Sequence, residues 1–161
     1  MNELPKRKQI RLKDYNYSQN GYYYITICAK DKKPLFGKIE SGEMKLNHYG
    51  KIALDEMMDI QTHYQNVKID KFVIMPNHVH CIIIIDGAGA ASGAPTAMGE
   101  NPVLGNIVRG YKSAVSRKCK NSIWQRSYYE HIIRNETDYL EIYKYIEENP
   151  IKWEKDSYWE L

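Results

Sequence analysis

The sequence lacks both the long apolar runs of membrane proteins and the dense cysteine pattern of small secreted domains. No stretch of about eighteen apolar residues occurs, so we expect no transmembrane helix. The basic start, MNELPKRKQIRLKDY, is not followed by an apolar stretch, which argues against a secretory signal. Cys28, Cys81 and Cys119 are odd in number and far apart. A disulfide framework is therefore not expected, and a reducing cytoplasm is the simplest location.

Length and composition indicate one globular domain over residues 1–161. The chain is long enough to bury a working core, and 43% apolar and 27% charged residues are ordinary proportions. No internal repeat is visible. Two segments differ from the rest: residues 1–19, which we interpret as a basic N-terminal arm, and residues 87–102, GAGAASGAPTAMGENP, which predict a flexible surface loop.

The net charge of +3 is too small to indicate a partner, but the charges are unevenly distributed. Between residues 109 and 126 there is no acidic residue and there are six basic ones: Arg109, Lys112, Arg117, Lys118, Lys120 and Arg126. This predicts a basic face for a polyanion, although a solvated helix face explains it as well. The 14 tyrosines suit stacking on the bases of single strands, and tyrosine-rich cores are also common.

Strand-like patterns dominate the first half of the chain. Residues 22–28, YYYITIC, predict a buried strand, and residues 36–46 predict a hairpin around Ser41-Gly42. Residues 48–64 have the spacing of an amphipathic helix. Residues 67–74 and 79–85 predict two paired strands around a turn at residues 75–77, and the isoleucine run indicates that the second of them is central.

Helical patterns dominate the second half. An apolar stripe from Val103 to Val115 predicts one helix, and a last helix is expected from about Glu136 to Asn149, because Pro150 cannot continue it. We expect an α+β fold in which helices pack on an antiparallel sheet, with a ferredoxin-like arrangement.

The segment PNHVHCI places His78 and His80 two residues apart at the start of a predicted strand. Successive side chains on a strand point to opposite faces, so these two imidazoles share a face and can chelate one divalent ion. A pair of structural histidines is the alternative, because a His-x-His pattern is common by chance.

Tyr145 and Asn149 form a second candidate constellation in the last predicted helix. They are four residues apart and hence neighbours on one helix face. There an amide oxygen can complete a metal site, and a phenolate can attack a phosphorus that the metal polarises. The alternatives are a helix-terminating asparagine and a core tyrosine. Spacing alone does not decide between Tyr143 and Tyr145.

Four stretches in series resemble the REP-associated tyrosine transposases, of the single-tyrosine HUH transposase superfamily. The matching segments are MPNHVHCIIII (75–85), IVRGYKSAVSRK (107–118), IWQRSYYEHIIRN (123–135) and YIEENPIKW (145–153). The early strand YYYITIC also fits, and the likeness runs from about residue 20 to the end in family order and spacing. The resemblance implies a ferredoxin-like sheet with the HUH motif on a central strand.

The resemblance also implies a role for each residue of the two constellations. His78 and His80 match the histidines that bind Mg²⁺ or Mn²⁺, although two histidines would also accept Zn²⁺. Tyr145 matches the nucleophile. Asn149 matches the position of the third protein ligand, which is usually glutamine in the related insertion-sequence enzymes; because asparagine is shorter, a water can replace it.

The implied activity is that of a metal-dependent single-stranded DNA endonuclease and strand transferase. It acts on hairpin-containing DNA, such as REP-like sequences or element ends, and forms a 5′-phosphotyrosine intermediate, as a monomer or a homodimer. For DNA contact the candidates are the six basic residues of 109–126 together with Trp124, which either stacks on a base or fills the core.

Two other functions fit the same residues. The first is a protein that binds DNA hairpins without transposition activity in the cell. The second is an unrelated metal-dependent phosphoesterase that uses water and needs no tyrosine.

Overall fold

The computed structural model describes residues 21–86 and 102–153. The basic arm predicted over residues 1–19 and nearly all of the loop predicted over residues 87–102 lie outside this part of the chain. Within the described residues, no helix combines the length and the apolar character needed to cross a membrane. The elements in chain order are β1 (Tyr22–Cys28), η1 (Lys30–Lys32), β2 (Gly37–Glu40), β3 (Glu43–Leu46), α2 (His48–His63), β4 (Val67–Met75), β5 (His78–Ile85), α3 (Pro102–Cys119), β6 (Tyr129–Ile133) and α4 (Glu136–Glu148).

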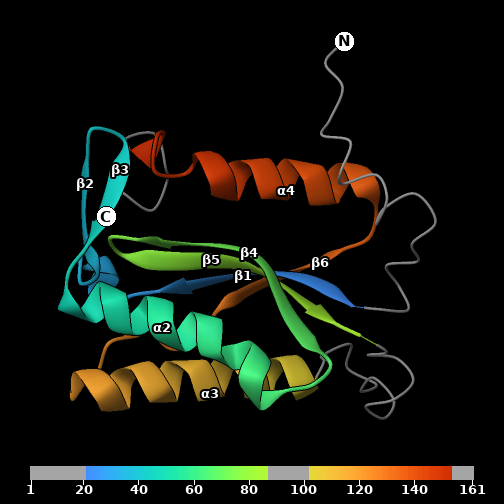
Figure 1. The fold of residues 1–161 in the computed structure, drawn as a ribbon, viewed down its shortest axis with the longest axis horizontal. Coiled ribbons are helices and arrows are strands. Elements are labelled where there is room, and N and C mark those ends of the chain that lie inside the picture. Colours follow the sequence, from blue (N-terminus) through green and yellow to red (C-terminus); the bar gives the residue numbers. More distant parts are fainter. Residues whose placement is uncertain (1–20, 87–101, 154–161) are drawn as a thin grey trace.

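Four strands form one antiparallel sheet in the order β4-β5-β1-β6. Helices α2 and α3 cover one face of this sheet, and α4 lies across the other (Figure 1). The hairpin β2–β3 forms a separate two-stranded sheet. The succession β1-α2-β4-β5-α3-β6 with this strand order is ferredoxin-like. The predicted α+β class and topology are therefore confirmed.

Strand β5 is buried over its whole length, as its isoleucine run predicted for a central strand. Its alternate residues divide between two apolar clusters. Val79, Cys81, Ile83 and Ile85 belong to the larger core under α2 and α3. Ile82 and Ile84 belong to a smaller core, which they share with residues of α4.

Strand β6 was not expected from the sequence. Its five residues, YEHII, mix polar and apolar side chains, and only Ile133 is fully buried. It is an edge strand that pairs with β1 alone, in a register that joins Tyr24 to His131. Because its strand character comes from this long-range pairing and not from a local pattern, periodicity could not identify it.

Residues at a bulge in β4 bind α4 to the sheet. The register between β4 and β5 shifts between Ile69 and Lys71, so Asp70 is the extra residue. The Asp70 carboxylate accepts a hydrogen bond from the Tyr139 hydroxyl. The ammonium group of Lys71 lies 4.8 Å from the ring centroid of Tyr143. These two contacts fix the position of α4 over the sheet.

Helix α4 begins with a side-chain cap. Asn135 is in an extended conformation, and its Oδ1 accepts a hydrogen bond of 2.8 Å from the backbone N–H of Asp138. Two acidic residues, Glu136 and Asp138, lie in the first turn, where the helix dipole favours negative charge.

Removing this cap should weaken the fold. We expect Asn135→Ala to lower the free energy of unfolding by about 0.5–2 kcal/mol, because one N–H at the helix start loses its acceptor. Urea denaturation followed by circular dichroism measures the change. Asn135→Asp keeps an acceptor at the same position and should retain most of the stability. Equal losses in the two variants would contradict the role of the cap.

Candidate active site

His78 and His80 lie at the start of β5, on the face of the sheet that α4 covers. Both side chains are completely buried. Their Nε2 atoms are 3.0 Å apart, and their ring centroids are 4.5 Å apart. The alternation of the strand brings the two imidazoles together, as the His-x-His spacing predicted.

The outer ring nitrogens of both histidines are held by the surrounding protein. His78 Nδ1 is 2.7 Å from Asn77 Oδ1, and Asn77 Nδ2 donates to the carbonyl of Lys32 at 3.2 Å, which orients the amide. Because an amide oxygen only accepts, His78 Nδ1 carries the proton, and Nε2 of the neutral ring carries a lone pair.

His80 is held in the same manner from strand β1. Its Nδ1 lies 2.9 Å from the hydroxyl of Tyr24 and 2.9 Å from that of Thr26. Fixing the outer nitrogen of an imidazole by a neighbouring polar group is how proteins orient histidines that bind metals. The arrangement directs both Nε2 atoms toward one point.

Tyr145 lies beside this histidine pair. Its ring centroid is 5.3 Å from that of His80, at an interplanar angle of 61°. The side chain is 41% exposed, in contrast to the buried histidines. Tyr143, which spacing left as an alternative, packs against Tyr139 and Lys71 instead. Of the two tyrosines, the structure thus brings Tyr145 next to the histidines.

Asn149 follows Tyr145 by one helical turn and is only 2% exposed. Its Nδ2 donates to the backbone carbonyl of Tyr145 at 3.3 Å. Its Oδ1 is buried and has no hydrogen-bond partner within the described part of the chain. Buried polar atoms are nearly always satisfied, so this oxygen needs an explanation.

These donors fit a divalent cation. Two adjacent ligands, each about 2.1 Å from an octahedral ion, are about 3 Å apart, which matches the separation of the two Nε2 atoms. Among the described residues, no group of three or more His, Cys, Asp or Glu side chains is placed to hold a metal ion, so a third protein ligand beside the histidines would be of another type, such as the Asn149 amide oxygen. Cys81 does not extend the site, because it lies in the core of the opposite face and burial raises its thiol pKa to about 12.

Comparison with known families matches residues 17–149 to the family described as Transposase IS200 like. The chain belongs to the IS200-like transposase family. An uncharacterized protein of Haemophilus influenzae is 45% identical to it over 165 residues, which cover 94% of this chain and 92% of that protein.

Among solved structures, a REP-associated tyrosine transposase bound to a REP hairpin matches this chain with a TM-score of 0.62 and 21% sequence identity. The match covers 95% of this chain and 74% of that one. At this identity the likeness concerns the fold. Together with the family match, it confirms the resemblance that the four sequence motifs carry.

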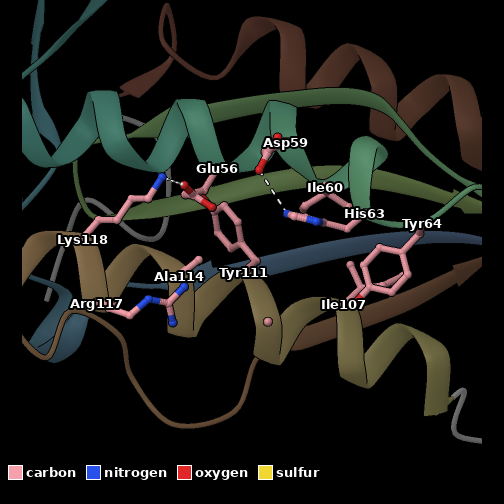
Figure 2. A pocket seen from close by; sticks show the side chains of 11 residues that line it. Glu56, Asp59, Ile60, His63, Tyr64, Ile107, Tyr111, Ala114, Arg117 and Lys118 are labelled. Atoms are coloured by element: carbon pink, nitrogen blue, oxygen red, sulfur yellow. Dashed lines mark ion pairs between the residues drawn. The ribbon is translucent and has the colours of Figure 1, made fainter.

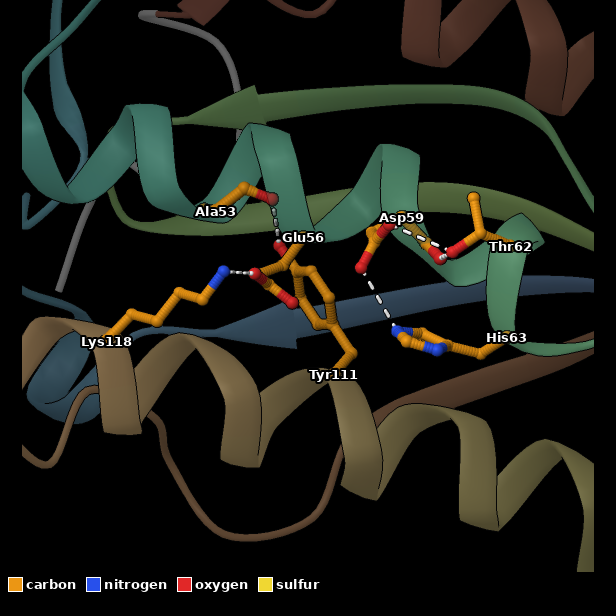
Figure 3. A network of polar contacts seen from close by, with 7 residues as sticks. All are labelled: Ala53, Glu56, Asp59, Thr62, His63, Tyr111 and Lys118. Carbon is orange, nitrogen blue, oxygen red and sulfur yellow. Dashed lines mark hydrogen bonds and ion pairs between the residues drawn. The ribbon is translucent and has the colours of Figure 1, made fainter.

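The basic residues of α3 lie across the sheet from the two histidines. Arg117 and Lys118 line a pocket of about 340 Å³ between α2 and α3, together with Glu56 and Asp59 (Figure 2). Lys118 forms an ion pair with Glu56, whose side chain is only 8% exposed (Figure 3). Part of the basic charge on this helix therefore balances a buried carboxylate of α2.

Two further candidates for DNA contact, Trp124 and Lys112, have structural roles within the protein. Trp124 is 8% exposed, packs against Phe36 and Tyr111, and donates from Nε1 to the carbonyl of Lys112. Trp124 therefore fills the core, which is one of its two predicted roles, and its buried indole cannot stack on a base. Burial lowers the pKa of Lys112. By contrast, Arg109, Lys120 and Arg126 are exposed.

Sequence analysis missed the residues that hold the histidines. Thr26 is paired with His80, and Tyr24 with Ile82, in the β1–β5 ladder. Only the register of this pairing shows that the two residues of β1 lie near His80. Asn77 was interpreted only as a turn residue. No role was predicted for Trp153, and its ring lies 6.3 Å from that of His78. His131 pairs with Asp138 at 2.7 Å.

Lys112 offers a test of this structural role. Its Nζ donates to the carbonyls of Gln125 and Ser127, both at 2.9 Å. We expect Lys112→Met to lower the free energy of unfolding by about 1–3 kcal/mol, because two carbonyls lose their donor. The matched control is Arg109→Met, an exposed residue one turn earlier, which should change stability little. A Lys112→Met chain of full stability and reduced DNA affinity would contradict this assignment.

Proposed function

We propose that this transposase-family protein is a metal-dependent enzyme that nicks and rejoins single-stranded DNA through Tyr145. The observation that carries the proposal is the contact between the exposed Tyr145 ring and the buried His78–His80 pair, at 5.3 Å from His80. A phenol beside two converging imidazole nitrogens suits nucleophilic attack on a phosphorus held there.

The residues that would hold the ion are His78, His80 and Asn149. Mg²⁺ or Mn²⁺ is the natural choice for phosphate chemistry, and the ion supplies polarisation of the scissile phosphate and stabilisation of its developing charge when bound. Tyr24, Thr26 and Asn77 keep the imidazoles in place through their outer nitrogens.

The reaction begins at the hydroxyl of Tyr145, a side chain that is 41% exposed and so can be reached by a DNA strand. A tyrosine has an ordinary pKa of about 10, so the phenol must lose its proton as it attacks. The bond from the Tyr145 oxygen to phosphorus forms while the bond from phosphorus to the 3′-oxygen breaks. The 3′-oxygen takes up a proton, which leaves a 5′-phosphotyrosine and a free 3′-hydroxyl.

Strand joining is the reverse of this step. A second 3′-hydroxyl attacks the same phosphorus and releases Tyr145, so the number of phosphoester bonds is conserved and no nucleotide cofactor is required. The contacts of Tyr139 with Asp70 and of Tyr143 with Lys71 hold α4, and with it Tyr145, over the sheet.

The proposed partner is single-stranded DNA that contains hairpins. The related transposase of known structure was bound to a REP hairpin. For this chain the exposed Arg109, Lys120 and Arg126 remain candidates for phosphate contact. We propose a cytoplasmic location, and the site is compatible with either a monomer or a homodimer.

A covalent adduct is the direct test. We expect the chain, incubated with Mn²⁺ and a labelled single strand carrying a hairpin, to give a DNA-linked band on a denaturing gel. Tyr145→Phe should reduce this band at least about a hundredfold, because no other group replaces the nucleophile. His78→Ala should also remove it.

Tyr143→Phe is the matched control, since it removes the same atom two residues away and should leave the adduct. Loss of the adduct in Tyr143→Phe alone would move the nucleophile to that residue. Binding without cleavage would favour a protein that recognises hairpins without nicking them. Cleavage that survives Tyr145→Phe would favour hydrolysis by water.

Metal affinity tests the role of Asn149. We expect Asn149→Ala to weaken Mn²⁺ binding about tenfold or more in isothermal titration calorimetry, with His78→Ala as the reference for loss of the site. Asn149→Asp places a carboxylate oxygen at the same position and should bind Mn²⁺ at least as tightly as the unaltered chain. Unchanged affinity in Asn149→Ala would assign the third position to water.

A further inference from the structure

A cleft lies along the hairpin β2–β3 and reaches Asn77, the residue before His78. Two adjoining hollows of about 280 and 570 Å³ share Ile39 and Trp153 in their walls. In the larger hollow, residues of the hairpin form one side, and residues of the segment that follows α4 form the other. We call the two hollows together the hairpin–Trp153 cleft.

The inner end of the cleft is joined to His78 by direct contacts. Asn77, which bonds His78 Nδ1, is part of its wall, and so is Lys32, whose carbonyl accepts from Asn77 Nδ2. The ring of Trp153 lies 6.3 Å from that of His78, at an interplanar angle of 22°. A strand in the cleft would therefore lie next to the histidine pair that Tyr145 contacts.

The lining of the cleft is basic and apolar. Three of its residues are lysines, Lys32, Lys38 and Lys152, and none of the lining residues in the described part of the chain is acidic. Lys38 pairs with Glu40 on the surface, and Lys152 pairs with Glu148. Such exposed pairs contribute little, so phosphates can compete for these ammonium groups.

The cleft also offers flat and apolar surface. Trp153 is half-buried, while Ile151 is 74% exposed, an unusual position for a large aliphatic side chain. A groove that combines lysines with an aromatic side chain is suited to single-stranded nucleic acid, because bases stack on the ring while phosphates meet the lysines.

The pocket between α2 and α3 does not compete for this role. It lies on the opposite face of the sheet from the histidines, and Glu56 and Asp59 are among its lining residues (Figures 2 and 3). A strand held there would be separated from Tyr145 by the sheet.

We propose that the hairpin–Trp153 cleft binds the single strand that adjoins the scissile phosphate. In this assignment a base stacks on Trp153, and Lys32 and Lys38 contact the phosphates of neighbouring nucleotides. The assignment rests on the proposed function, since it deepens the description of how the same site takes its DNA.

Binding measured without cleavage tests the cleft by itself. The full chain is titrated with a fluorescein-labelled oligothymidine strand in EDTA, at several salt concentrations, and fluorescence anisotropy is recorded. We expect Trp153→Ala to bind roughly 5- to 150-fold more weakly, and Trp153→Phe to recover most of the affinity. Lys32→Ala and Lys38→Ala should each lower the slope of log affinity against log salt by about 0.7.

The matched control is Lys68→Ala, an exposed lysine of β4 whose partner in the ladder is Ile84, at the end of β5 away from His78. It should bind as the unaltered chain does. Thermal melting checks that each variant is folded. If Trp153→Ala does not fold, Lys38→Ala, which changes an exposed residue, still tests the cleft.

The outcomes separate this inference from the proposed function. Unchanged affinity and salt slope in the folded cleft variants would overturn the cleft, even if the Tyr145 adduct forms. Binding that depends on the cleft, in a chain that forms no adduct with Mn²⁺, would overturn the nicking activity and leave the cleft in place. Equal loss of affinity for a blunt duplex in Trp153→Ala would overturn base stacking as the reason.

Discussion

The structure depends on holding two buried imidazoles with their Nε2 atoms 3.0 Å apart. Two imidazole nitrogens at this distance need a proton or a cation between them, because their lone pairs would otherwise repel. The fold maintains the arrangement through the outer nitrogens, which Asn77 holds on one ring and Tyr24 and Thr26 hold on the other. The register of β1 against β5 and the turn before β5 are thus as important to the site as the histidines themselves.

The two faces of the sheet divide the tasks of the protein. The larger core under α2 and α3 includes Trp124 and Tyr111, and the charges of α3 are in part used there, as in the pair of Lys118 with Glu56. The smaller core on the other face holds α4 through fewer apolar side chains. Helix α4 can therefore present Tyr145 to solvent and keep Asn149 buried without weakening the main core, which fits the tendency of functional elements to be less firmly packed.

The sequence predicts those features that depend on local periodicity. Spacing alone places His78 with His80 on one face of a strand, and Tyr145 with Asn149 on one face of a helix, and the structure agrees on both. It does not predict what depends on pairing between distant segments. Strand β6 exists because β1 lies beside it, and Thr26 meets His80 across 54 positions of sequence. The basic helix shows the same limit, since charge patterning cannot tell that Lys112 binds two carbonyls of its own chain.

Asn149 shows why a structural and a functional explanation need not compete. As the residue before Pro150 it ends α4, and its backbone N–H bonds the carbonyl of Ile146. Helix termination does not account for a side-chain oxygen that is buried with no partner in the described part of the chain. The bond from Nδ2 to the carbonyl of Tyr145 orients that oxygen and ties it to the turn that carries the phenol. In the proposed reaction, a ligand and a nucleophile on one helical turn would keep a fixed spacing, because the turn itself sets the distance between them.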